Sequence, residues 1–160
     1  MIVHWLTVEE GLVKTVARGA RRGKGGLSGR IDLFLEGEIV WNRARAGKGD
    51  LGMLKEVSVI DYRLPLRESY RRTLVAGYFC QLLEGVLEPD HPVPELYDLL
   101  QRGLGWLTSD EMENQGRRGL FHFEKELGNL LGLGKSGASG IVEAFGGLPK
   151  SRNHCLDLLS

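Results

Sequence analysis

Hydrophobic and polar residues alternate along much of the first third of the chain, which is typical of half-buried β-strands. Short alternating or β-branched segments occupy residues 2–8, 12–17, 31–41 and 51–60. In the segment 31–41 one parity carries Ile31, Leu33, Leu35, Ile39 and Trp41, interrupted by Gly37, and the other parity carries the acidic residues. A glycine within a long strand is typical of a bend or bulge. The pattern predicts four strands, the first two forming a hairpin, with a bulge at Gly37.

The spacing of the apolar residues becomes helical after a break at residues 61–65, where Pro65 suits the start of a helix. Apolar residues then recur every four positions, at Leu66, Tyr70, Leu74, Tyr78 and Leu82. A second helix is predicted over 93–107, a third near 110–131 capped by Thr108 or Ser109, and short helices over 141–145 and after a cap at Ser151. We expect the glycine-rich stretch 132–140 to be a flexible connector.

The order of these elements, strands first and helices second, predicts an α+β protein. We expect a small β-barrel over residues 1–62, followed by an α-helical domain over residues 63–160. The length of 160 residues suits one domain or two small ones that share an interface.

A basic, glycine-rich segment lies between the second and third predicted strands, at residues 16–30. It contains no acidic residue and five cations, Arg18, Arg21, Arg22, Lys24 and Arg30. Because a glycine-rich segment cannot bury a core, we expect a mobile loop whose cations can meet a polyanion and whose glycines let backbone N–H groups approach phosphates. The alternative interpretation is a solvated basic loop that only keeps the protein soluble.

The net charge is zero, but the two halves of the chain differ in charge. Residues 1–80 carry fourteen Lys or Arg against nine Asp or Glu, a net charge of +5, and residues 81–160 carry −5. The candidate nucleic-acid-binding residues all lie in the basic half: Lys14, Arg18, Arg21, Arg22, Lys24, Arg30, Arg43, Arg45 and Lys48. The candidate stacking aromatics are Trp5, Phe34 and Trp41, of which Phe34 lies on the outward parity of its strand and Trp41 on the core parity. Backbone contacts should therefore dominate, with little sequence preference and a strong dependence on salt.

The case for an enzyme is poor. The segment Gly134-Lys135-Ser136 ends like a phosphate-binding loop, but it lacks the earlier glycine and follows a helix rather than a strand. Glu124 and Glu126, beside Lys125, are interpreted as a solvated helix face. We expect no catalytic residue, no cofactor and no metal.

The cysteines and the N-terminal residues indicate the compartment. Cys80 and Cys155 are too few for a disulfide framework, which favours a reducing cytosol. The first residues lack the pattern of a signal peptide, and no stretch approaches the ~20 apolar residues of a membrane span. We expect a cytoplasmic, nucleoid-associated protein that makes no contact with a membrane.

Two segments carry a resemblance to a known family. They are "LVKTVARGARRGKGGLSGRIDLFLEGEIV" (12–40) and "GDLGMLKEVSVIDYRLPLRESYRRTLVAGYFCQLLEGVL" (49–87), with a fainter match in "LFHFEKELGNLLGLG" (120–134). In this ordered set the chain resembles the bacterial DNA repair protein RecO family. The resemblance implies an OB-fold barrel and a helical C-terminal domain that bind single- and double-stranded DNA and anneal complementary strands. It also implies two partners, the tail of a single-stranded DNA-binding protein and a RecR-like mediator that helps to load recombinase.

The chain departs from the family pattern in two respects. Family members usually begin earlier, with one more strand, so this chain either starts late or has a barrel without its first strand. Many members carry four zinc-binding cysteines, whereas this chain has no Cys-x-x-Cys, so we expect no structural zinc.

Two further functions stay open as alternatives. The first is an adaptor that docks the acidic tail of the single-stranded DNA-binding protein between helices, with Arg67, Arg71, Arg72 and Arg102 as the candidate cations. The second is an OB-type RNA-binding factor, which charge alone does not distinguish from a DNA-binding protein.

Overall fold

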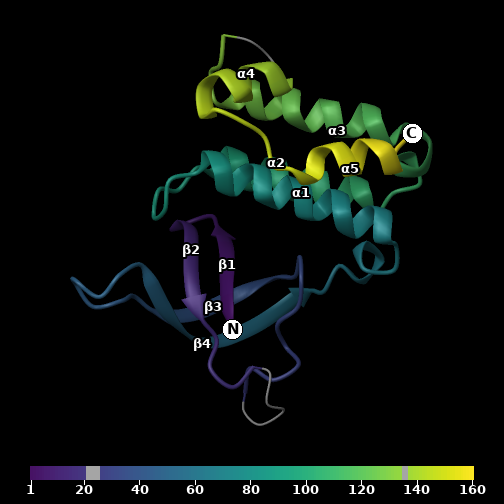
Figure 1. The fold of residues 1–160 in the computed structure, drawn as a ribbon. Helices are drawn as coiled ribbons and strands as arrows, with labels where there is room; N and C mark the ends of the chain where they lie inside the picture. Colours follow the sequence, from purple (N-terminus) through teal and green to yellow (C-terminus); the bar gives the residue numbers. More distant parts are fainter. Residues whose placement is uncertain (21–25, 135–136) are drawn as a thin grey trace. The chain divides into compact units, whose positions relative to one another are not determined.

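The structure is a computed structural model that describes residues 1–20, 26–134 and 137–160. The chain divides into two compact units, which are described separately (Figure 1). Unit 1 contains Met1–Arg63 together with Pro89–Pro92, and unit 2 contains Leu64–Glu88 and Val93–Ser160. The protein is therefore of the α+β class, with its strands in unit 1 and its helices in unit 2.

Among its described residues, unit 1 is built on a four-stranded mixed sheet, as the alternation predicts. Its strands are β1 (Ile2–Thr7), β2 (Gly11–Val16), β3 (Glu36–Asn42) and β4 (Leu51–Asp61), in the spatial order β1-β2-β4-β3. The hairpin β1–β2 is antiparallel, β2 and β4 are parallel, and β3 and β4 are antiparallel. The sheet is open in the described part of the chain, where no pairing joins β1 to β3.

The third strand begins later than predicted, at Glu36 instead of Ile31. Phe34 adopts φ 63°, and a turn at this point separates Leu33, which is 58% exposed, from the sheet. The apolar parity of residues 31–35 therefore does not reflect a strand. The predicted bulge is confirmed, because the β3–β4 register shifts between Glu36 and Gly37. A Cβ atom at Gly37 would lie 2.6 Å from the carbonyl oxygen of Ser58, so the close approach of the two strands needs a glycine.

The core of unit 1 corrects the expectation that the glycine-rich segment buries nothing. Leu27 is only 8% exposed and packs with Ala17, Leu54 and Val57. Residues 26–30 form a turn that carries Leu27 into this core. The described end of the segment is thus anchored by one leucine, because an apolar side chain can supply burial that the glycines around it cannot.

In the part of unit 2 that the structure describes, there are a short 3-10 helix and five α-helices. They are η1 (Leu64–Leu66), α1 (Tyr70–Val86), α2 (Pro94–Leu107), α3 (Glu111–Leu130), α4 (Gly137–Phe145) and α5 (Ser151–Leu158). Helix α1 packs against α2 and α5, α2 against α3, and α3 against α4 (Figure 1).

Several helix boundaries differ from the sequence prediction. The Thr108 and Ser109 hydroxyls donate backwards to the carbonyls of Gly105 and Trp106, so they end α2 and do not cap α3. Helix α4 begins at Gly137, inside the predicted connector, and Ser151 lies within α5. Tyr70 is 66% exposed although the four-residue repeat includes it. Four residues turn a helix by about 400°, so such a repeat drifts off the buried face within a few turns.

The core of unit 2 contains a stacked aromatic pair and one carboxylate. The rings of Phe79 and Phe123 lie 3.8 Å apart and are nearly parallel. Glu124, beside them in sequence, is only 1% exposed. Its interpretation as part of a solvated helix face is therefore wrong, because side chains from α1 and α5 cover it.

Candidate nucleic-acid interface

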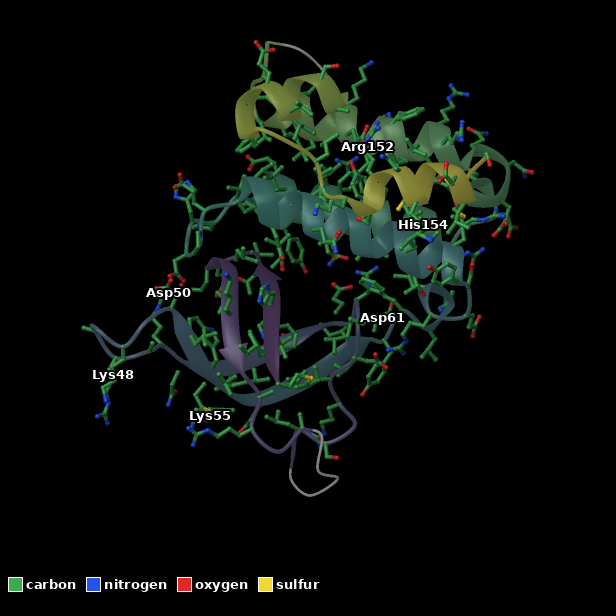
Figure 2. All side chains as sticks on the ribbon, viewed as in Figure 1. Lys48, Asp50, Lys55, Asp61, Arg152 and His154 are labelled. Carbon is green, nitrogen blue, oxygen red and sulfur yellow. The ribbon has the colours of Figure 1, made fainter. Side chains whose placement is uncertain are left out.

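The described candidate cations of unit 1 lie on or just after β2 and in the two loops that flank β3. Lys14 is half-buried on β2, and Arg18 is exposed just after this strand. Arg30 is exposed at the end of the turn 26–30, and Arg45 and Lys48 are exposed in the β3–β4 loop. Figure 2 shows Lys48 at the far end of that loop. Arg21, Arg22 and Lys24 lie outside the described residues.

Strand register brings the two predicted basic clusters together. Because β2 and β4 are parallel with Lys14 opposite Leu51, Lys14 lies beside the end of the β3–β4 loop. Lys14 and Arg43 line the same pocket, which has a volume of about 120 Å³. Trp41, Asp50 and Asp90 line it as well. One cation from each cluster therefore faces the same hollow of the surface.

Arg43 differs from the other cations because two carboxylates hold it. Its guanidinium pairs with Glu10 and, at 3.2 Å, with Asp90, while its carbon lies 5.3 Å from the centre of the Trp41 ring. Asp90 reaches this position because its backbone N–H donates to the carbonyl of Leu12 on β2. The sequence analysis did not predict that Glu10 and Asp90 pair with Arg43. The acidic turn Glu9-Glu10 between two strands was a usable signal for such a pairing.

Four other cations have no such partner. The side chains of Arg18, Arg30, Arg45 and Lys48 make no hydrogen bond or ion pair with any residue that the structure describes. Moving them onto a phosphate would break no existing ion pair.

The candidate aromatics are largely structural. Trp5 donates from Nε1 to Oγ1 of the buried Thr15 at 2.8 Å. The Trp41 ring packs on Gly52, where a Cβ atom would come within 2.5 Å of the ring. Phe34 is half-buried in the turn before β3, not on the face of a strand as predicted. Base stacking therefore has little support in the described part of unit 1.

The candidate peptide-binding arginines of unit 2 do not form one exposed set. Arg71 and Arg72 converge on Glu113, with N–O distances of 3.2 and 3.5 Å. Arg102 pairs with Asp98 on its own helix at 2.8 Å, and Arg67 is half-buried just before α1. The structure thus joins two of the four at one carboxylate.

A buried polar network in unit 2 escaped the sequence reasoning. Tyr78 donates to Oε1 of Glu124 at 2.6 Å, and Arg152 grips the same carboxylate with two hydrogen bonds of 2.6 and 3.0 Å. Burial, and then the hydrogen bond to Glu124, raises the pKa of Tyr78 well above its ordinary value. The hydrogen bond to Glu124 also raises the pKa of Arg152. The network ties α1, α3 and α5 together.

The comparisons with known proteins agree with this two-unit architecture. Residues 1–63 match the family model "Recombination protein O N terminal", and residues 67–141 match "Recombination protein O C terminal". The chain belongs to the RecO family. The two models cover strands β1 to β4 and helices α1 to α3, and the C-terminal model ends within α4, so α5 lies outside both.

Several curated relatives share the name DNA repair protein RecO. The one from Syntrophotalea carbinolica is 32% identical over 99 residues, which is 62% of this chain and 38% of the relative. One from Listeria monocytogenes is 34% identical over 98 residues, 61% of this chain and 37% of the relative. One from Pelobacter propionicus is 29% identical over 131 residues, 82% of this chain and 51% of the relative. The chain thus spans between 37% and 51% of the length of these RecO relatives.

The remaining candidate features of this RecO-family chain are its two cysteines, metal binding and membrane-spanning helices. Burial raises the pKa of the Cys155 thiol to about 11 and, with a smaller contribution from Glu84, that of Cys80 to about 12. Both thiols therefore stay protonated and weakly nucleophilic near neutral pH. Within the described ranges, no group of three or more His, Cys, Asp or Glu side chains could hold a metal ion. No described helix is both long and apolar enough to cross a membrane.

Proposed function

We propose that this chain binds single- and double-stranded DNA without sequence preference in recombinational DNA repair. In this role it anneals complementary strands and, with a RecR-like mediator, helps to load recombinase at the nucleoid of the cytoplasm. Membership of the RecO family and the shared name of its relatives support the role in repair. The observation that carries the DNA contact is that four exposed candidate cations of unit 1, Arg18, Arg30, Arg45 and Lys48, have no carboxylate partner among the described residues.

The proposed domains follow the two units. We interpret unit 1 as an OB-like nucleic-acid-binding domain whose described strands form an open sheet, with the helical domain after it. A single additional strand that paired with both β1 and β3 would close the observed order β1-β2-β4-β3 into a five-stranded barrel. The loops that flank β3 would then present cations beside the barrel surface, as OB folds do.

Charge neutralisation supplies the proposed affinity. Each phosphate that is neutralised releases condensed counterions, and for single strands the log–log salt slope changes by about 0.7 per contact. With Lys14 included, the described cations would contact about five phosphates and produce a slope of roughly −3.5. Because these contacts reach the sugar–phosphate backbone, they carry no direct sequence information.

Annealing follows from the same contacts. Two complementary strands repel each other through their phosphates, and cations on loops lower that repulsion while the base edges stay accessible. No covalent step is involved, so the proposed function requires no acid, base or metal. The glycine-rich segment contributes Arg18, Arg21, Arg22 and Lys24 to this proposal.

The binding test compares two exposed lysines of unit 1. Figure 2 labels both: Lys48 lies in the β3–β4 loop and Lys55 on β4, outside the proposed contact set. We expect Lys48→Ala to lower the salt slope for a labelled single strand by about 0.7, and Lys55→Ala to leave it unchanged. Equal slopes for the two variants and wild type would remove Lys48 from the interface. Failure of the wild type to bind strands at 50 mM salt would refute the proposed function.

The annealing test uses complementary oligonucleotides. We expect the quadruple Arg18→Ala, Arg21→Ala, Arg22→Ala, Lys24→Ala variant to anneal them more slowly than wild type, as followed by fluorescence quenching between the two strands. An unchanged rate would exclude the glycine-rich segment from annealing. An RNA strand of the same sequence that binds more tightly than DNA would favour an RNA-binding factor instead.

A second candidate function is an adaptor for the acidic tail of a single-stranded DNA-binding protein. One observation favours it: Arg71 and Arg72 already converge on a carboxylate, that of Glu113. A tail carboxylate would have to displace Glu113, so Glu113→Gln should tighten binding of an acidic peptide that ends in an apolar residue. No binding of such a peptide at low salt, to wild type or to this variant, would count against the adaptor.

A further inference from the structure

The solvent-facing side of helix α3 carries a continuous polar row. After a kink at Gln115, the residues Arg118, His122, Lys125 and Asn129 follow one another at intervals of four, three and four. All four are exposed, whereas Leu120, Phe123 and Leu127 on the opposite side are buried. Intervals of three and four residues keep side chains on one face of a helix, so the row runs straight along α3.

The two cations of this row differ from other cations of unit 2 that pair with carboxylates. Arg71, Arg72, Arg102 and Arg152 each meet a carboxylate. In contrast, the side chains of Arg118 and Lys125 have no hydrogen bond or ion pair with any described residue. The nearest acidic residues of the helix lie off the row, with Glu124 buried and Glu126 half-buried at its edge.

We propose that this face of α3, formed by Arg118, His122, Lys125 and Asn129, binds the phosphate backbone of a nucleic-acid strand. It is a contact additional to the cations of unit 1, and it rests on the proposed function. The seven residue steps from Arg118 to Lys125 span about 10.5 Å at the helical rise of 1.5 Å per residue. At about 3.4 Å of duplex axis per phosphate of each strand, that length matches roughly three phosphates along one strand of a duplex, and fewer along a more extended single strand.

The shape of the face favours a phosphate chain over an acidic peptide. A peptide that docks on a protein surface needs pockets for apolar anchors, whereas a ridge of donors along a single helix offers charge alone. The exposed aromatic beside the row, Phe121, already has the Arg152 guanidinium 5.7 Å from the centre of its ring. Arg118 and Lys125 supply the charge, while His122 and Asn129 supply N–H donors to phosphate oxygens.

The test compares two lysines of unit 2 by titration of labelled single strands. Lys125→Gln removes a cation from the row, and Lys150→Gln removes an exposed cation that lies off it, just before α5. One phosphate contact contributes about 0.7 to the salt slope, so between about 1 M and 50 mM salt it changes Kd by at most about eightfold. We expect Lys125→Gln to raise Kd by up to this factor, and the double variant Arg118→Gln, Lys125→Gln to lower the slope by about 1.4. Lys150→Gln should match wild type.

The outcomes separate this inference from the proposed function. If wild type binds DNA and the double variant retains its Kd and slope, the α3 contact is excluded and the unit 1 contacts stand. If wild type binds no strand at all, both proposals fail. An unchanged DNA slope together with weaker binding of an acidic peptide would overturn the inference in favour of a protein partner. Circular dichroism of each variant establishes that the exposed substitutions leave the helices intact.

Discussion

The buried carboxylate of Glu124 allows a sharp prediction about stability. Glu124 accepts hydrogen bonds from Tyr78 and Arg152 and is 1% exposed, so its charge has almost no contact with water. In the variant Arg152→Met the apolar packing of the side-chain stem is largely kept, but the cation is lost. The carboxylate would then lie in the core with only the Tyr78 hydroxyl as a partner.

The magnitude of the effect follows from the cost of an uncompensated buried charge. Removing one member of a buried ion pair destabilises a protein by about 3–5 kcal/mol. For a chain of this size, that loss lowers Tm by roughly 6–20 °C. Replacing both members restores most of the stability, because Gln at position 124 can still accept from Tyr78 and no charge remains buried. We therefore expect the double variant Glu124→Gln, Arg152→Met to be more stable than Arg152→Met alone.

Urea unfolding followed by circular dichroism measures these free energies of unfolding. The matched control is Arg102→Met, which breaks an exposed pair with Asp98 on the same helix and should cost no more than about 0.5 kcal/mol. If Arg152→Met proved as mild as this control, or the double variant less stable than the single one, the charge of Glu124 would not be what Arg152 compensates.

Three further predictions concern other parts of the chain. Neutralising the two carboxylates that pair with Arg43, by Glu10→Gln and Asp90→Asn, makes its guanidinium available to phosphate. The double variant should bind single strands more tightly, and its salt slope should be steeper by about 0.7. An unchanged slope in the binding titration would contradict this prediction. Gly52→Ala should lower the free energy of unfolding in urea titrations by about 1–3 kcal/mol, because the new Cβ would overlap the indole ring of Trp41. An unaltered unfolding midpoint would show that the ring can move aside. Burial raises the pKa of Cys155 from 9.0 to about 11, so between these pH values the thiol ionises in the unfolded chain but not in the folded one. The free energy of unfolding should therefore fall by about 1.4 kcal/mol per pH unit as the pH rises through this range. Cys155→Ala should remove that component from the pH profile of stability, and a profile identical to that of wild type would refute the prediction.

Much of the fold could be predicted because it depends on neighbours in sequence. Alternation of apolar and polar residues located the four strands, and Gly37 marked the bulge in β3. The same rule failed for residues 31–35, where the parity is that of a strand but Phe34 has a positive φ. Apolar residues at alternate positions can be buried by a loop as well as by a sheet, and only the packing around Leu27 distinguishes the two.

The candidate sites divide in the same way. Charge and hydrophobic period are properties of the chain, so they already show that the cations lie mostly in the first half and that helices follow strands. Tertiary structure alone decided which charges are already satisfied: Arg43 by Glu10 and Asp90, and Glu124 by Arg152. The two kinds of interaction differ in the sequence separation over which they act. Alternation acts between neighbouring residues, whereas an ion pair depends on distances across space that the folded backbone creates between residues far apart in the sequence.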